Sequence, residues 1–529
     1  MNFIRSTSIL LLFCGFFAHA TTLEKSTTPK NTFIALCYHD ISSGFAGDAY
    51  SVHKKDFIDQ LDYLKANYNV VSLQDILDAS KGKKILPPKA VLITVDDGLA
   101  SFYENVYPLL KSYKFKSVFS IVGKWIDDGS APNYGFKDSN PKMATWKQIK
   151  EMQDSGWVDI ASHTYDLHQG QLINPQGNQA AMASFFKYDP ATKSYQSEED
   201  FINYVRADLK KNNELIKKNL GKDNSIVVWP YGAFNSLSSK AAIQAGLPIQ
   251  MTLRAGPNNA RNISYIGRGL VLTEMTIQQF AKALDQAFVD NTPLRMIRVD
   301  IDGLWKNTEA ETEIELGDLL DQSLALGANG VLVQAISDNG EAYFPTSHLK
   351  VRGDYLNRTI HALKYRARVD YAYVRLPQSF LKNTATATAA IRDLAKFTDI
   401  DGIFFEISSK ESLKTLPFKA FMASGRSIRP LLQFGLIGQS PTKTGLFDYE
   451  IMTTPQLEKE KLATSSSKTP KVIVALSHDY KQQVPHLLSQ GYTNLLYDVN
   501  FKGFVPDTDF KNLFSVRQIV SKQNKGDSK

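Results

Sequence analysis

The sequence has very few cysteines and no long apolar run beyond its first twenty residues. Its only cysteines are Cys14 and Cys37, and removal of an N-terminal signal would leave just one, which excludes an internal disulfide. This fits a bacterial periplasm, where disulfides are permitted but not required. No later stretch reaches the roughly 20 apolar residues that a membrane-spanning helix needs. We therefore expect a soluble, exported mature chain.

The sequence also lacks a concentrated block of charge and a short internal repeat. The formal net charge is +7, but the basic residues are dispersed, which argues against nucleic acid as a partner. This mild positive charge is still compatible with binding to an anionic surface. The composition, 43% apolar and 22% charged, is that of a globular protein with ample core. At 529 residues we expect two or more domains, because single cores rarely exceed about 300 residues.

The N-terminus reads as a secretory signal. Arg5 supplies the basic charge, Ile9–Phe13 forms an apolar segment, and Ala18-His19-Ala20 is a small-residue cleavage site. An uncleaved anchor is disfavoured because the apolar run is short. A lipoprotein attached at Cys14 is less favoured, because Phe13 occupies a position where a small residue is expected. We predict a periplasmic or secreted protein.

Two successive alternations of short apolar strands and amphipathic helices follow. In the first, strands predicted over residues 33–38, 90–93, 117–122, 157–161, 226–229, 249–253 and 266–268 alternate with helices over 54–68, 103–112, 145–155, 199–220 and 239–245. In the second, strands are predicted over residues 296–299, 330–333, 369–374, 402–405, 430–434, 449–452, 472–476 and 494–498. This pattern predicts parallel sheets in an α/β fold.

The predicted architecture is an N-terminal distorted (β/α) barrel followed by a slightly small (β/α)8-like barrel. The predicted segments are a signal peptide (1–20), a linker (21–31), a first domain (32–290) and a second domain (291–529). Residues 169–199 are polar and are predicted to form a surface insertion in the first domain, and residues 459–470 a loop in the second.

Chemically distinctive residues follow the strands of the first domain. Asp96 and Asp97, in Thr-Val-Asp-Asp-Gly, close one apolar run, and adjacent carboxylates there are costly unless something compensates them. His163 and His168, in Ser-His-Thr-Tyr-Asp-Leu-His, close another, and His39 closes the run 33–38. Asp-Asp-Gly alone is usually a turn, and a lone histidine pair is usually incidental. Because all these residues fall at strand ends, where barrel enzymes place catalytic groups, together they favour a divalent-metal site.

These motifs resemble those of the polysaccharide deacetylases, the NodB-homology group of carbohydrate esterase family four. Thr-Val-Asp96-Asp97-Gly stands for the family's Thr-Phe-Asp-Asp-Gly motif, and Ser162-His163 to His168 for its second motif, with the histidines five apart instead of the usual four. With the upstream Cys-Tyr-His39-Asp, the chain looks most like the periplasmic poly-β-1,6-N-acetyl-D-glucosamine N-deacetylases, in which the motif order is permuted. The resemblance covers residues 33 to about 275 well and the remainder weakly.

The resemblance implies a role for each residue. Asp97, His163 and His168 would hold one divalent metal, Asp96 would be the general base, and His39 the general acid. An Asp-His-His set accepts zinc, cobalt, nickel or iron. His39 has a structural alternative, in which it caps a carbonyl at a strand end.

The third family motif is only partly present. Trp229-Pro230-Tyr231-Gly232 matches its Pro-Tyr-Gly, but the arginine that normally precedes it and orients the base is missing. Arg268 is a candidate substitute, and we also predict that it binds substrate together with Trp229 and Tyr231; the alternative is a surface arginine. Trp229 and Tyr231 would stack on sugar rings, with core packing as the competing role. Asp40 and Asp166 would orient the histidines or cap local turns.

The second domain resembles the C-terminal glycoside-hydrolase-like domain of the same enzymes. Ile407 and Ser408 replace the adjacent aspartates that follow the fourth strand in active members. Hydrolysis needs a placed carboxylate pair, so we predict a glycan-binding or degenerate barrel. Carboxylates at its strand ends would line an acidic groove for partly deacetylated, cationic glycan: Asp300, Asp302, Glu406 and Asp498.

The resemblance thus implies a metal-dependent N-deacetylase acting on poly-β-1,6-N-acetyl-D-glucosamine during biofilm exopolysaccharide export, and we expect it to be a monomer. The predicted partners are the N-acetylglucosamine polymer and outer-membrane export machinery. Two alternatives stay open: a deacetylase of chitin-like or peptidoglycan glycans, and a non-catalytic glycan-binding or export factor.

Overall fold

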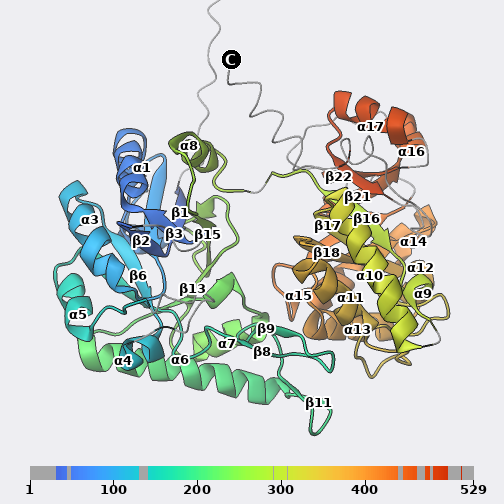
Figure 1. Cartoon of the computed structure of the whole chain (residues 1–529), viewed down its shortest axis with the longest axis horizontal. Coiled ribbons are helices and arrows are strands. Elements are labelled where there is room, and N and C mark those ends of the chain that lie inside the picture. The colour runs from blue at the N-terminus through green and yellow to red at the C-terminus, as the bar shows by residue number, and fades with distance from the viewer. Residues whose placement is uncertain are drawn as a thin grey trace, which may run out of the picture.

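The computed structural model describes most of the chain as two β/α units. The described residues are 31–44, 49–129, 131, 141–289, 291–306, 308–438, 445–460, 471–476, 480–497 and 514. The predicted signal peptide, nearly all of the predicted linker, and Asp498 lie outside them. Figure 1 shows the first unit in blue to green and the second in yellow to red. Among the described residues, no helix has both the length and the apolar character to cross a membrane.

The first unit is a distorted barrel of parallel strands. Its strands are β1 (Thr32–Tyr38), β5 (Ala90–Val95), β6 (Ser117–Ile121), β7 (Val158–Ser162), β12 (Ile226–Val228), β13 (Ile249–Thr252) and β15 (Tyr265–Leu270), with β4 (Asn69–Val70) and β14 (Asn258–Asn259) added at the sides. Strand β1 pairs in parallel with both β15 and β5 and so closes the barrel. Between β7 and β12 only Ser162 and Val227 pair, which makes the barrel irregular. The predicted distorted barrel is confirmed.

The helices of the first unit cover this barrel. They are α1 (Lys54–Asn67), α2 (Leu73–Ser80), α3 (Tyr107–Tyr113), α4 (Gly123–Asp128), α5 (Trp146–Asp154), α6 (Glu198–Leu220), α7 (Ser236–Gln244) and α8 (Ile277–Asp285), with a π turn η1 (Phe102–Val106) and a 3-10 turn η2 (Pro230–Gly232). The predicted helix over 103–112 is therefore divided between η1 and α3. Helix α6, capped by Ser197 and ended by Gly221 at φ 74°, is the long green helix in Figure 1.

Short strand pairs carry the remaining chain of the first unit. They are β2 (Asp40–Ser42) with β3 (Ser51–His53), β8 (Gly170–Leu172) with β9 (Gln179–Ala181), and β10 (Tyr188–Asp189) with β11 (Ser194–Tyr195). The last two pairs form the predicted insertion between β7 and α6.

The second unit is a closed barrel of eight parallel strands, as predicted. They are β16 (Arg295–Val299), β17 (Gly330–Gln334), β18 (Tyr371–Pro377), β19 (Gly402–Glu406), β20 (Gln433–Ile437), β21 (Tyr449–Thr453), β22 (Lys471–Leu476) and β23 (Asn494–Tyr497). Its helices are α9 (Ile301–Leu304), α10 (Glu309–Leu326), α11 (Tyr355–Tyr365), α12 (Gln378–Leu381), α13 (Thr384–Phe397), α14 (Lys410–Thr415), α15 (Phe418–Arg426), α16 (Thr454–Glu460) and α17 (Tyr480–Ser489). Inward side chains such as Met296, Phe404 and Leu496 fill the barrel, so it is a packed core rather than a pore.

The two units meet through the insertion and the start of α6. Glu198 pairs with Arg392, whose Nη2 lies 2.9 Å from Oε2, and with the Lys396 ammonium at 3.2 Å. The ring of Tyr195 packs against Phe397 with centroids 4.6 Å apart. These contacts fix the first turn of α6 against α13 of the second barrel.

Candidate metal centre

The carboxyl ends of β1, β5 and β7 bring the predicted site residues together. Asp96 and Asp97 follow β5, all of whose residues are buried, His39 follows β1, and His163 follows β7. Backbone bonds lock these ends: the Asp96 N–H donates to the Tyr38 carbonyl at 2.9 Å, and the His163 N–H to that of Ile121 at 2.9 Å. Because neighbouring parallel strands end on the same side, residues far apart in sequence converge there.

Asp97, His163 and His168 form a compact buried set of three metal-ligating groups. The Nε2 atoms of both histidines lie 3.4 Å from Asp97 Oδ1, and one ligand atom from each residue lies within 4.8 Å of the others. All three side chains are buried. Asp97 adopts φ 77°, a left-handed conformation that aspartate tolerates better than most residues and that turns its side chain toward the histidines.

Hydrogen bonding fixes the histidine orientation. Nδ1 of His163 lies 2.7 Å from the carbonyl oxygen of Val228, so a proton on Nδ1 donates to that carbonyl and leaves the Nε2 lone pair facing Asp97. The ring of His168 lies between Trp125, at 4.7 Å between centroids, and Tyr231, at 4.6 Å. Two imidazole nitrogens and a carboxylate suit zinc, cobalt, nickel or iron, so the residues present fit a divalent metal.

The histidines beside Asp97 lower the pKa of its carboxyl group. Burial acts to raise that pKa, but the two histidines that face the carboxylate, His163 and His168, outweigh it and hold the pKa well below its ordinary value. The carboxylate is therefore ionised and available as a ligand.

Asp96 is held by a different set of groups. Arg268 donates from Nη1 to Oδ1 at 2.8 Å and from Nη2 to Oδ2 at 2.9 Å, a bidentate pair. The Ser120 hydroxyl donates to Oδ1 at 2.8 Å, and the Cys37 thiol to Oδ2 at 3.4 Å. Burial opposes the charge of Asp96, but Arg268 prevails and lowers its pKa. Asp96 is thus an ionised, oriented acceptor.

Arg268 has the orienting position that was predicted for it as the substitute for the missing arginine. It comes from β15, which pairs with β1, and is 0% exposed. A fully buried guanidinium does not reach a glycan, so its grouping with substrate-binding residues is wrong.

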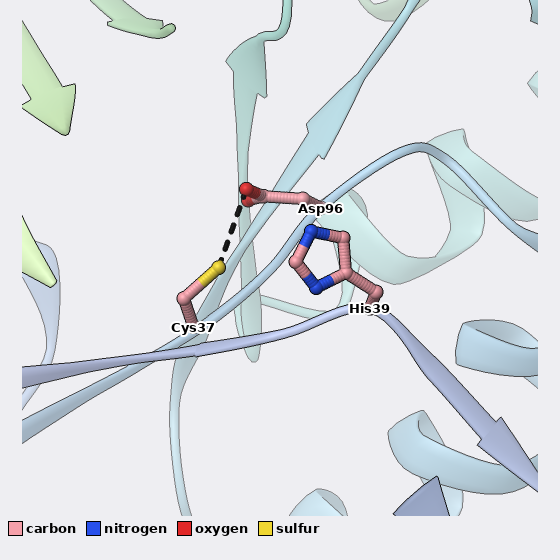
Figure 2. A group of neighbouring side chains, drawn as sticks. All are labelled: Cys37, His39 and Asp96. Carbon is pink, nitrogen blue, oxygen red and sulfur yellow. Dashed lines mark hydrogen bonds between the residues drawn. The ribbon is translucent and has the colours of Figure 1, made fainter. Parts of the chain in front are cut away.

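Figure 2 shows His39 beside Asp96 and Cys37. One ring nitrogen of His39 lies within 4.8 Å of both the Asp96 carboxylate and the Cys37 sulfur, and its ring packs 5.3 Å from that of Tyr50. The Nδ1 atom of His39 is buried without a hydrogen-bond partner among the described residues. Burial raises the pKa of the Cys37 thiol, so Cys37 is a protonated donor to Asp96.

The two aromatic residues of the third motif have different surroundings. Trp229 is fully buried, and its indole N–H donates to Gln250 Oε1 at 2.9 Å. Trp229 therefore packs in the core, and the prediction that it contacts substrate is wrong. Tyr231 is 54% exposed, and its ring lies at the rim of the site beside His168.

Several residues that hold the site were missed from the sequence. Asp208 of α6 accepts hydrogen bonds from the backbone N–H groups of Tyr165 and Asp166, both at 2.8 Å. Asn212, one helical turn later, donates to the Ser162 hydroxyl at 2.8 Å. Burial raises the pKa of Asp208 to about 6 despite the two backbone donors. The signal in the sequence that could have identified them is that both are polar residues on the buried stripe of the amphipathic helix α6.

Asp40 and Asp166 were predicted to orient the histidines, but their side chains bind other groups. Asp40 accepts a hydrogen bond from Ser51 at 2.7 Å, and Asp166 pairs with Lys124 at 3.1 Å. Neither contact orients a histidine; the Val228 carbonyl does so for His163.

Among the residues that the structure describes, the predicted groove acids Asp300, Asp302 and Glu406 each pair with arginine instead of lining an open acidic groove. Asp300 and Glu406 both pair with Arg375. Asp302 pairs with Arg352 at 2.9 Å and accepts a bond from the Gln334 amide at 2.7 Å. The predicted acidic groove is therefore largely compensated by arginine.

Comparison with known proteins places the first unit in a family. Residues 83–249 match the model of the polysaccharide deacetylase family. The chain belongs to this family through its N-terminal domain. Residues 298–391 match hypothetical glycosyl hydrolase family 13.

Among its relatives is the poly-beta-1,6-N-acetyl-D-glucosamine N-deacetylase of Escherichia coli K12, 27% identical over 364 residues. That alignment covers 66% of this chain and 54% of the relative, so the chain spans about half of the relative's length. A solved de-N-acetylase from Aggregatibacter actinomycetemcomitans is 33% identical over 47% of this chain and 99% of its own, at a TM-score of 0.44. The BpsB deacetylase domain from Bordetella bronchiseptica is 34% identical. The match covers 46% of this chain and 97% of that domain, at a TM-score of 0.41.

Proposed function

We propose that this chain is a metal-dependent N-deacetylase of poly-β-1,6-N-acetyl-D-glucosamine. The observation that carries the proposal is the buried Asp96–Arg268 pair beside the Asp97, His163 and His168 set. It places an oriented base beside a metal-ligating triad, a combination that can activate a water for attack on an amide carbonyl. Relatives named poly-beta-1,6-N-acetyl-D-glucosamine N-deacetylase support this choice of glycan.

The residues divide the reaction between them. A divalent metal held by Asp97, His163 and His168 would polarise the amide carbonyl and make the attacking water more acidic. Asp96, fixed by Arg268 and Ser120, accepts the proton of that water as its oxygen bonds to the carbonyl carbon. His39 then donates a proton to the amide nitrogen as the C–N bond breaks, which releases acetate and leaves an amine on the sugar. Tyr231 at the rim is placed to pack against a sugar ring.

Acetate release tests this function. The metal-loaded protein is mixed with N-acetylglucosamine oligomers of β-1,6 or β-1,4 linkage, before and after chelation, and acetate is measured. Metal-dependent release from the β-1,6 oligomer is expected. Faster release from the β-1,4 oligomer would assign the enzyme to chitin-like or peptidoglycan glycans, and release from neither would leave a non-catalytic glycan-binding or export factor.

We also propose export of the chain to the periplasm through residues 1–20, and an encounter there with outer-membrane export machinery. The basic, apolar and small-residue segments of the N-terminus support the first part. Fractionation of cells expressing the full chain tests it, with N-terminal sequencing of the product. Recovery of the uncleaved chain in the cytoplasm would refute it.

A further inference from the structure

A second group of metal-ligating residues lies beside the first and shares no residue with it. Cys37, His39 and Asp96 each offer one ligand atom, and these three atoms lie within 4.8 Å of one another. Figure 2 shows the three side chains converging. Cys37 lies in β1 and His39 directly follows that strand, whereas Asp96 follows β5. Because β1 and β5 pair in parallel, their carboxyl ends bring the group together.

The spacing of two of these atoms matches that of two ligands on one metal ion. Cys37 Sγ lies 3.4 Å from Asp96 Oδ2. Zinc holds a thiolate sulfur at about 2.3 Å and a carboxylate oxygen at about 2.1 Å, and the tetrahedral angle then separates the two ligands by about 3.6 Å. The thiol proton lies in this gap in the metal-free chain, so an ion can take the place of that proton.

Asp96 can bind an ion there without losing the groups that orient it. Its Oδ1 accepts from Arg268 and Ser120, whereas its Oδ2 accepts from Arg268 and from the Cys37 thiol. An ion that replaces the thiol proton at Oδ2 therefore leaves the bidentate pair with Arg268 intact. The positive charge of that guanidinium opposes a further cation, so this group binds metal more weakly than Asp97, His163 and His168 do.

His39 is the open side of the group. Cys37 is fully buried and Asp96 is 2% exposed, whereas His39 is half-buried. The Nδ1 atom of His39 has no hydrogen-bond partner among the described residues, so the ring can turn toward an ion without breaking a hydrogen bond at that atom. An ion can enter past His39 and take water as its fourth ligand.

We propose that Cys37, His39 and Asp96 form a second, weaker zinc site, which fills when metal exceeds one ion per chain and inhibits the enzyme. Binding breaks the S–H bond of Cys37, releases the proton to solvent and forms a zinc–sulfur bond, while His39 binds as the neutral imidazole. One ion then occupies both the base and the acid of the reaction. The inhibition rests on the proposed function, whereas the site itself does not.

Titration of the metal-free full chain with cobalt tests the proposal. A thiolate bound to cobalt gives a strong charge-transfer absorption in the near ultraviolet, which nitrogen and oxygen ligands do not give. All samples carry Cys14→Ser, so that Cys37 is their only cysteine. Cys37→Ser removes the thiolate but keeps a hydroxyl donor to Asp96. The control is Ser117→Ala, at a buried residue that begins β6 and so lies at the opposite end of the barrel.

The absorption should be absent with one cobalt ion per chain and appear in excess cobalt, where acetate release should fall at least tenfold relative to one ion per chain. Cys37→Ser should show neither the absorption nor this relative fall, and Ser117→Ala should show both.

Absence of the absorption in excess cobalt, or its persistence in Cys37→Ser, would overturn the site. Unchanged acetate release in the presence of the absorption would overturn the inhibition. Absence of acetate release at every cobalt concentration would instead refute the proposed function, and the absorption would still decide whether the site exists.

Discussion

The two barrels use buried arginine in opposite ways. In the first, Arg268 gives both of its terminal nitrogens to one carboxylate, Asp96, and leaves Asp97 to the two histidines. In the second, Arg375 divides its nitrogens between Asp300 and Glu406. The first arrangement orients a single base beside a free set of ligands, whereas the second occupies two carboxylates at once. Strand-end acids in a barrel therefore indicate chemistry only when the partner of each acid is known.

The largest effect expected in the first barrel is that of removing a metal ligand. His163→Ala deletes one of the two imidazoles and should abolish metal binding and reduce acetate release about a thousandfold or more. Metal content per chain and acetate release are measured on the same sample. Metal content at the wild-type level would show that His163 is not a ligand, and the first barrel would then lack the metal-ligating set that distinguishes it from the second.

Asp96→Asn separates the base from the ligands. Asparagine keeps the size but cannot accept the proton, so acetate release should fall about 10²- to 10⁴-fold while metal content stays at the wild-type level. Metal analysis beside the rate decides this. An active Asp96→Asn enzyme would refute the assignment of the base.

A pair of arginine substitutions tests the difference between the barrels. Arg268→Leu leaves the buried Asp96 carboxylate without its partner and should lower acetate release about 100-fold, with a loss of about 3–5 kcal/mol in the free energy of unfolding. Arg352→Leu, which removes the partner of Asp302 in the second barrel, should leave acetate release within about twofold of wild type. Equal losses of activity in the two variants would contradict the proposed division of labour.

Asp208→Asn should have a smaller effect on the same site. An amide provides a single acceptor oxygen, so one of the N–H groups of Tyr165 and Asp166 loses its partner and the histidine loop shifts. We expect metal affinity to fall about 10- to 100-fold with kcat at saturating metal nearly unchanged. Glu199→Gln, on an exposed part of the same helix, is the control. A fall in kcat at saturating metal would show a role beyond positioning.

The smallest effect should come from the contact between the barrels. Hydrogen bonds from Arg392, with the charge of Lys396, lower the pKa of Glu198 to about 2 from an ordinary value near 4.5. Because the folded pKa is depressed, this stabilisation is complete above pH 4.5 and is lost as the pH falls toward 2. Glu198→Gln should lower the melting temperature slightly at pH 7 and match the wild type near pH 2.

Thermal unfolding at several pH values measures this, with Asp154→Asn as the control because its pair with Lys150 is exposed on both sides. A melting-temperature difference that persists at pH 2 would show that Glu198 acts through packing rather than through its charge.

Local patterns in the sequence were enough to predict both barrels and the convergence of the metal-ligating set. The alternation of short apolar strands and helices is a local pattern that burial imposes, and parallel strands bring their carboxyl ends to one side. Asp97, His163 and His168 therefore lie together as their strand-end positions predicted. The replacement of the second barrel's aspartates by Ile407 and Ser408 is likewise visible in the sequence.

The partner of each of these groups depends on the order and register of the strands across the barrel. Arg268 reaches Asp96 across 172 residues because β15 pairs with β1 and β1 with β5, a strand order that no local pattern encodes. The same applies to Asp208 under the histidine loop and to Arg375 between two carboxylates. Trp229 was misassigned because the sequence does not show whether an aromatic residue beside a motif faces the core or the solvent. Hydrophobic periodicity sets which residues are buried, whereas the pairing of buried charges depends on register and strand order across the whole barrel.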